Sequence, residues 1–206
     1  MLLKIKRQDC LNKYPIFPLR SYDLEKDEDV SFYPKVFKSY ILTLSSKSIK
    51  AHIKALGIEL TGLTKAFNAD VLIFLGDTET PWLHQQNEYK PVQEAQQYLV
   101  ANKIGKRFNG ALQADTAELP VFIKHLAWLI RCNASLPYFY FTDPGNKILV
   151  TICQYGNLHL DTLNAEADKM IKAFMHSSKL QYGNNSSCYN QFGKTGAISG
   201  RQITID

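Results

Sequence analysis

The chain has 206 residues, of which 45% are hydrophobic and 21% charged, with a formal net charge of +5. This balance is typical of a globular protein and excludes a disordered chain, and the length suits one domain with a substantial core. No stretch has the apolar run of a signal peptide or of a membrane helix, and the four cysteines form no CxxC pair. We therefore expect a cytoplasmic protein with no membrane contact, no cofactor and no metal-binding motif.

The first 35 residues contain three prolines and a run of acidic and basic side chains. Proline fixes its own φ, removes a hydrogen-bond donor and restricts the preceding residue. We predict an irregular N-terminal arm over residues 1–35 that lies across the rest of the chain. Residues 36–206 are predicted to form a single mixed α/β globular domain.

Strands and helices alternate in the first half of this domain. The apolar stretch 36–44 predicts a strand, followed by a helix that ends near Leu56 because Gly57 is a common helix terminator. Residues 58–68 are ambiguous between helix and loop. Residues 71–75, VLIFL, predict a strand buried on both faces. This alternation suggests at least one parallel crossover connection.

Two further helices are predicted in the middle of the chain. Pro91 suits the first turn of a helix over 92–103, and a short strand is expected at 108–114. The helix at 116–133 has a wide apolar stripe that should face a sheet. Val121 and Trp128 project from its opposite side. We expect the N-terminal arm to cover Trp128.

The clearest structural signal is residues 137–164, in which two turns connect three apolar runs. A two-residue loop at Gly156-Asn157 would place polar residues beside the apolar side of the preceding run. A three-residue loop instead aligns the apolar residues, and we predict this register because a one-residue slip reverses every side chain. The residues on the opposite, partly polar face are then Tyr138, Tyr140, Leu149, Thr151, Cys153, His159 and Asp161.

The fold class predicted from these elements is α+β. We expect a mixed β-sheet that contains an antiparallel three-strand meander at about 138–163, with helices packed on the sheet.

Chemical motifs are weak. The loop after the buried strand carries Asp77, His84, Glu88 and Lys90, which could hold a divalent cation for hydrolysis, although polar loops of this kind are common. His159 and Asp161 lie two residues apart on a strand, about 7 Å from each other, which favours a structural histidine. Cys132 and Cys153 lie in apolar stretches of the sequence and are predicted to be small core residues.

Other functional classes have little support. No GxxxxGK[ST] or GxGxxG motif follows a strand, which argues against nucleotide binding. Residues 31–70 carry six basic and two acidic residues but no arginine, so nucleic-acid recognition is not expected.

The sequence therefore favours a non-catalytic interaction protein that binds a protein partner of unknown identity, for example as an inhibitor or immunity-type protein. The alternative is a metal-dependent, nuclease-like hydrolase that uses the loop from Asp77 to Lys90. Tyrosine, tryptophan and adaptable polar residues such as asparagine and serine are typical of protein interfaces. The predicted binding residues are Val121, Trp128, Tyr182, Tyr189 and Phe192. The oligomeric state is not predicted.

Overall fold

The structure is a computed structural model that describes residues 2–23, 28–76, 80–84, 87–133, 139–183, 188–193 and 198–201. Its helices are α1 (Arg7–Lys13), α2 (Ile49–Ala66), α3 (Lys90–Ala101), α4 (Leu119–Cys132) and α5 (Ala165–Met175). Its strands are β1 (Leu3–Ile5), β2 (Leu19–Asp23), β3 (Glu28–Phe32), β4 (Lys38–Leu44), β5 (Val71–Leu75), β6 (Ala111–Asp115), β7 (Tyr140–Thr142), β8 (Ile148–Ile152), β9 (Leu158–Thr162) and β10 (Leu180–Tyr182).

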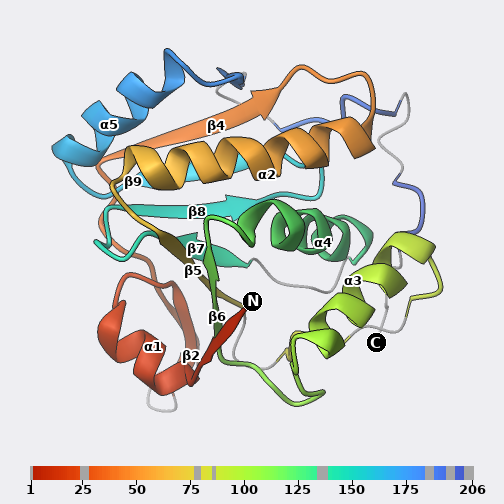
Figure 1. Cartoon of the computed structure of the whole chain (residues 1–206). Helices are drawn as coiled ribbons and strands as arrows, with labels where there is room; N and C mark the ends of the chain where they lie inside the picture. Colours follow the sequence, from red (N-terminus) through yellow and green to blue (C-terminus); the bar gives the residue numbers. More distant parts are fainter. Residues whose placement is uncertain are drawn as a thin grey trace.

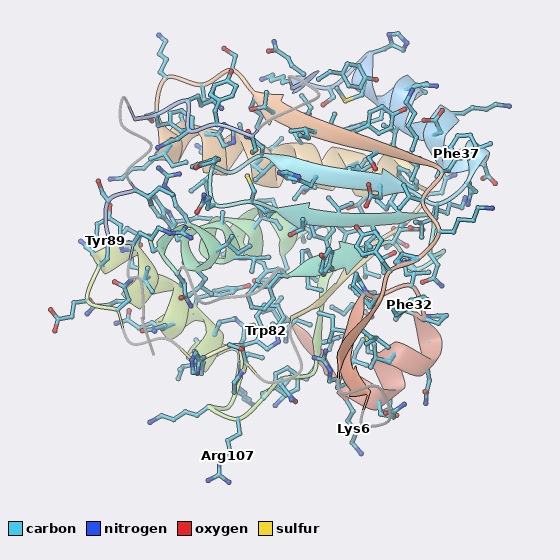
Figure 2. All side chains as sticks on the ribbon, turned by 180° about the vertical axis from the view of Figure 1, so that it is seen from behind. Lys6, Phe32, Phe37, Trp82, Tyr89 and Arg107 are labelled. Atoms are coloured by element: carbon cyan, nitrogen blue, oxygen red, sulfur yellow. The ribbon has the colours of Figure 1, made fainter. Side chains whose placement is uncertain are left out.

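Eight of these strands form one sheet in the order β1-β6-β5-β7-β8-β9-β4-β10, while β2 and β3 form a separate hairpin. Helices α2 and α4 lie across one face of the large sheet (Figure 1). Seen from behind, the strands stand in front of those helices, and the N-terminal elements cover only one end of the sheet (Figure 2). The α+β class predicted from the sequence is confirmed.

All strand pairs in the described part of the sheet are antiparallel, so the expected parallel crossover is wrong. Between the neighbouring strands β5 and β6, a parallel crossover would require α3 to carry the chain back along the sheet. Helix α3 instead packs on α4. The chain therefore enters β6 beside the end of β5, and the two strands run in opposite directions.

The predicted meander is confirmed as β7, β8 and β9. Val150 pairs with Leu160, and Ile152 with Leu158, which is the register of a three-residue loop. Gly156 in this loop has φ of 86°, a conformation that favours glycine. The apolar residues of the meander are buried against the helices: Phe139, Phe141, Val150, Ile152, Leu158 and Leu160.

Helix α2 continues past the end predicted at Gly57. Its N-terminus is capped by Ser48, whose Oγ accepts a hydrogen bond from the backbone N–H of Ala51 at 3.3 Å. A Cβ at Gly57 would lie 2.9 Å from Cα of Pro120, at the start of α4. Gly57 therefore allows close approach of the two helices and does not end the first one.

The N-terminal segment is not the irregular arm predicted from its prolines. It contains β1, α1 and the β2–β3 hairpin, and β1 joins the sheet by pairing with β6. Phe17 from this segment packs with Ile73 and Leu75 on the sheet face opposite α2 and α4. Trp128 belongs to the other core cluster and contacts the ring of Tyr89, with ring centroids 6.0 Å apart. The prediction that the arm covers Trp128 is therefore wrong.

Candidate functional site

The sheet face opposite α2 and α4 carries a row of polar side chains. The strand register makes His159 a direct neighbour of Ile41 on one side and of Thr151 on the other, and Thr151 is in turn a neighbour of Tyr140. Side chains of directly opposed residues lie on the same face of a sheet. The partly polar face predicted from the meander thus forms the base of the candidate site.

Two cysteines meet at one end of this row. Cys153 follows β8, and its backbone N–H donates to the carbonyl of Asn157 at 2.9 Å, which closes the hairpin loop. Cys188 comes from the described segment 188–193. The two Sγ atoms are 3.1 Å apart, and neither cysteine is in a disulfide bond.

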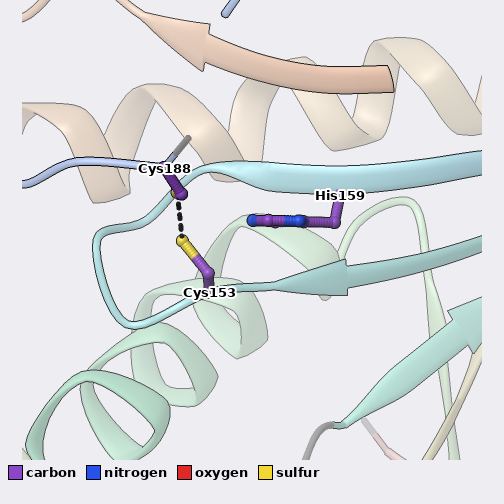
Figure 3. Close-up of side chains that lie close together, drawn as sticks. All are labelled: Cys153, His159 and Cys188. Atoms are coloured by element: carbon purple, nitrogen blue, oxygen red, sulfur yellow. Dashed lines mark hydrogen bonds between the residues drawn. The ribbon is translucent and has the colours of Figure 1, made fainter. Parts of the chain in front are cut away.

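The imidazole ring of His159 points towards the two cysteines (Figure 3). One ligand atom from each of Cys153, His159 and Cys188 can be chosen so that all three atoms lie within 4.8 Å of one another. This cluster of three side chains, called the thiol–histidine cluster below, is the only group of its kind among the residues that the structure describes. Each of its members is half-buried.

Asn157 holds Cys188 in place. Its Nδ2 donates to Sγ of Cys188 at 2.8 Å, and its Oδ1 accepts a hydrogen bond from Thr43 at 2.7 Å. Gln191 ties the same segment to β4, because its Nε2 donates to the carbonyl of Leu44 at 3.1 Å. The position of Cys188 beside Cys153 is therefore fixed by side-chain hydrogen bonds, because Cys188 does not belong to a helix or a strand.

His52 contacts the hairpin loop between β8 and β9. It is fully buried, and its Nε2 lies 2.8 Å from the carbonyl oxygen of Gly156. Burial lowers the pKa of His52 below its usual value, which favours the neutral ring. Phe192 packs edge-on against this ring with centroids 5.2 Å apart. His52 thus joins the loop to the segment that carries Cys188.

The two thiols have different acidities. The contact with the thiol of Cys153, together with the nearby ring of His159 and the hydrogen bond from Asn157, lowers the pKa of Cys188. The same contact with Cys188, followed by burial, raises the pKa of Cys153. The pair therefore favours a thiolate on Cys188 and a protonated thiol on Cys153.

Two buried polar atoms at the base of the site have no hydrogen-bond partner among the described residues. They are Nε2 of His159 and Oγ1 of Thr151. Buried polar groups in native proteins are nearly always satisfied, so such atoms call for a ligand, an ion or water. Because the two residues are neighbours across β8 and β9, both unsatisfied atoms belong to one site.

A cleft of about 810 Å³ adjoins the cluster at His159. The carboxylate of Asp161 accepts a hydrogen bond from the hydroxyl of Tyr33 at 2.5 Å, and Asp168 accepts one from Tyr40. Burial, followed by these hydrogen bonds, raises the pKa of both tyrosines, so both stay protonated. The cleft is lined by Tyr33, Lys38, Ser39, Tyr40, Ile41, Tyr140, Thr151, His159, Asp161, Lys172 and Tyr182.

Known proteins offer no guide to this site. Comparisons with protein families, with curated proteins and with solved structures find no match for the chain. None of the helices in the described ranges is long and apolar enough to cross a membrane. The functional argument therefore depends on the geometry alone.

The site predicted at the loop after β5 is not assembled in the described residues. Asp77 lies outside the described residues. His84, Glu88 and Lys90 are exposed and contribute to no metal-binding group there. The nuclease-like hypothesis thus stays a prediction.

The residues predicted to bind a partner fall into two groups. Val121, Tyr182 and Tyr189 are exposed. Trp128 is only 5% exposed, and Phe192 is half-buried against His52, so neither presents its whole side chain at the surface.

Sequence reasoning placed Cys153 and His159 on one face but missed their combination with Cys188. Cys153 was predicted to be a small core residue, whereas it is half-buried and in contact with a second thiol. The hydrogen bond between Asn157 and Cys188 spans 31 residues, and nothing in local spacing predicts it. The one available signal was composition, since Cys188 lies in a stretch rich in Asn, Ser and Tyr, where a core cysteine is not expected.

Proposed function

We propose that this protein binds Zn²⁺ through Cys153, His159 and Cys188, and that the metal centre acts on a ligand held in the adjoining cleft. Two thiols and an imidazole are the donor set that zinc prefers. The observation that carries the proposal is the convergence of the three ligand atoms within 4.8 Å, with Nε2 of His159 buried and otherwise unsatisfied.

The spacing of the donors is close to what zinc requires. Zn–S bonds of about 2.3 Å at a tetrahedral angle place two sulfur atoms about 3.8 Å apart. The observed separation is 3.1 Å, so the sulfur atoms need to move apart by well under 1 Å. The segment that carries Cys188 is held by side chains, and a shift of this size leaves the strands undisturbed.

Asn157 and its partners would serve as the outer shell of the centre. Groups that donate to metal-bound sulfur orient the ligand and tune its charge, and their loss commonly weakens metal binding by about 10- to 100-fold. The N–H group of Asn157 already contacts Sγ of Cys188 at 2.8 Å.

Three protein ligands are characteristic of catalytic zinc sites, which keep a fourth position for water or substrate. A zinc ion bound there would polarise a substrate carbonyl or lower the pKa of a bound water to about 7. The cleft beginning at His159 supplies side chains to hold the substrate, including Thr151 with its unsatisfied hydroxyl and Lys172. A hydrolytic reaction is therefore the activity that this arrangement favours.

The test is to replace zinc with Co²⁺ and record the absorption spectrum. We expect sulfur-to-cobalt charge-transfer bands and the visible bands of a tetrahedral site, and we expect His159→Ala and Cys188→Ser to lose them. Cys132→Ala and His84→Ala are matched controls, because these residues lie outside the cluster, and both variants should keep the spectrum. An unchanged spectrum in Cys188→Ser, or none in the parent protein, would contradict the proposal.

The protein-interaction hypothesis remains a separate prediction. It is supported by the exposed Tyr182 and Tyr189, whose side chains are 53% and 62% exposed. Tyrosine is enriched in interfaces because it offers a large contact area at a low cost in conformational entropy. The test compares the parent protein with Tyr182→Ala and Tyr189→Ala in binding a partner protein captured by the parent. Each substitution should abolish binding of that partner and leave zinc binding unchanged.

A further inference from the structure

We propose that Cys153 and Cys188 are also a site of reversible oxidation, at which hydrogen peroxide or an organic hydroperoxide converts the two thiols into an intramolecular disulfide. The oxidation depends only on the dithiol. Its consequence for the metal depends on the proposed zinc centre.

The sulfur separation lies between the values for the two states. A disulfide bond is about 2.05 Å long, and a tetrahedral zinc site holds its sulfur atoms about 3.8 Å apart. At 3.1 Å, the sulfur atoms of Cys153 and Cys188 need to approach by about 1 Å to bond. The same pair can therefore adopt either state through a small movement of one segment.

The surroundings assign different roles to the two cysteines. Sγ of Cys188 accepts a hydrogen bond from Nδ2 of Asn157, which stabilises negative charge on this sulfur. Cys188 is also half-buried and so accessible to a small oxidant. We assign Cys188 as the residue that attacks the peroxide and Cys153 as the residue that resolves the product. An accessible cysteine with a second thiol 3.1 Å away is placed for such chemistry, because the second thiol can resolve the oxidised product.

The reaction balances in two steps. In the first, the Cys188 thiolate attacks one oxygen of the hydroperoxide. The O–O bond breaks, Cys188 becomes a sulfenic acid, and the second oxygen leaves as water or an alcohol after taking up a proton. In the second, the sulfur of Cys153 attacks the sulfur of Cys188. The S–O bond breaks, the S–S bond forms, and the hydroxyl leaves as water with the proton of Cys153. Two thiols are oxidised and one peroxide is reduced.

The disulfide would remove two of the three proposed zinc ligands. Zinc is bound by thiolate sulfur, and a disulfide carries no such charge. Only His159 would remain, which cannot hold the ion alone. Oxidation would therefore release the metal, and reduction of the disulfide would restore the site.

The remaining cysteines provide an internal control. Cys10 and Cys132 are both fully buried, and burial raises the pKa of each thiol to about 11. Buried cysteines of this kind are inert towards peroxide.

The experiment treats the full-length protein with hydrogen peroxide, in metal-free and zinc-loaded forms, and counts free thiols after unfolding. We expect the count to fall from four to two, with the chain remaining a monomer on a non-reducing gel, and zinc to be released in parallel. Four remaining thiols in the metal-free protein, or disulfides between chains, would overturn the proposal. Disulfide formation in a protein that never bound zinc would uphold it while refuting the zinc centre.

Two variants test the assigned roles. With Cys153→Ser, the sulfenic acid should persist on Cys188 and react with dimedone, as shown by mass spectrometry. With Cys188→Ser, Cys153 should give no adduct. The double variant Cys10→Ala/Cys132→Ala should form the disulfide like the parent protein. A dimedone adduct on Cys153 and none on Cys188 would contradict the assignment.

Discussion

The two faces of the large sheet are built from the same strands but differ in chemistry. In β8 and the residue after it, Ile148, Val150 and Ile152 are buried against the helices, whereas Thr151 and Cys153 belong to the opposite face. The residues of β8 on the helix-covered face are apolar and fully buried. The other face collects the thiol–histidine cluster, the cleft and two unsatisfied polar atoms. The helix-covered face of β8 thus belongs wholly to the core, whereas the other face packs with the N-terminal segment at Leu149 and carries the candidate site at Thr151 and Cys153.

The largest expected effect is on the helix-covered face. Val150→Asp would bury a carboxylate without a partner, because Val150 is fully buried beside Leu160. The cost should exceed about 5 kcal/mol, which is comparable to the stability of a whole domain, and folding should be lost. Circular dichroism and thermal unfolding provide the measurement.

Val121→Asp is the matched control, because Val121 is 47% exposed near the N-terminus of α4, where a negative charge is favourable. It should change the free energy of unfolding by less than about 0.5 kcal/mol. A Val150→Asp variant that melts cooperatively near the parent temperature would refute the assigned core face.

The next effect concerns His125, the histidine buried on the helix side of the molecule. It stacks on Tyr98 with centroids 4.4 Å apart. Burial, followed by the charge of Lys124, lowers the pKa of His125 from 6.5 to about 4. The folded protein therefore binds this proton less readily than the unfolded chain. The associated stability is complete above pH 6.5 and lost as the pH falls to about 4, up to about 3 kcal/mol.

The measurement is the free energy of unfolding by urea between pH 7 and pH 4, compared with that of His125→Phe. The variant keeps an aromatic ring beside Tyr98 but has no titrating group, so its pH dependence should be shallower. Carboxylates that titrate in the same range contribute equally to both proteins. Parallel pH profiles for the two proteins would show that His125 is not responsible.

The sequence predicted which residues of the meander share a face, because the alternation of side chains along a strand decides this locally. It did not predict the contacts between segments that are distant in the sequence. The register of β8 and β9 followed from the parity of the loop at Gly156. The errors have one cause. Glycine tends to end a helix, but at Gly57 the close packing of α2 against Pro120 overrides this tendency. The prolines of residues 1–35 favour irregular structure, but the pairing of β1 with β6 makes this segment part of the sheet.

Only the part of the candidate site that lies on one hairpin could be predicted from the sequence. Cys153 and His159 lie on one hairpin, so strand alternation places them on one face. Cys188 joins them through Asn157 and Gln191, whose hydrogen bonds depend on the folded chain and leave no periodic pattern.

A smaller effect tests how closely the helices are packed. In Gly57→Ala the new Cβ would meet the backbone of Pro120 at 2.9 Å, whereas in Gly62→Ala it would meet the ring of Phe174 at 3.2 Å. The backbone of a helix cannot move away from a new methyl group as easily as a side chain can. Gly57→Ala should therefore lower stability by about 1–3 kcal/mol despite the better helix propensity of alanine. Gly62→Ala should change it by less than about 1 kcal/mol. Chemical denaturation measures both, and equal effects would contradict the close approach of α2 and α4.

The smallest effect is expected on the open face. Thr151→Val removes a buried hydroxyl that has no partner in the described residues, while keeping the shape of the side chain. Replacing an unsatisfied polar group should be neutral or stabilise the fold by up to about 1 kcal/mol. Zinc binding should be unchanged, because Thr151 is not a ligand in the proposed centre. A clear loss of stability would show that a partner satisfies this hydroxyl in the folded protein.

The most direct test of the zinc centre is anomalous X-ray diffraction at the zinc absorption edge, on crystals of the reduced protein prepared with zinc. The account predicts one anomalous peak among Cys153, His159 and Cys188, about 2.3 Å from each sulfur and about 2.0 Å from the histidine nitrogen. A zinc peak elsewhere in the chain, or no peak with the three side chains in place, would contradict it.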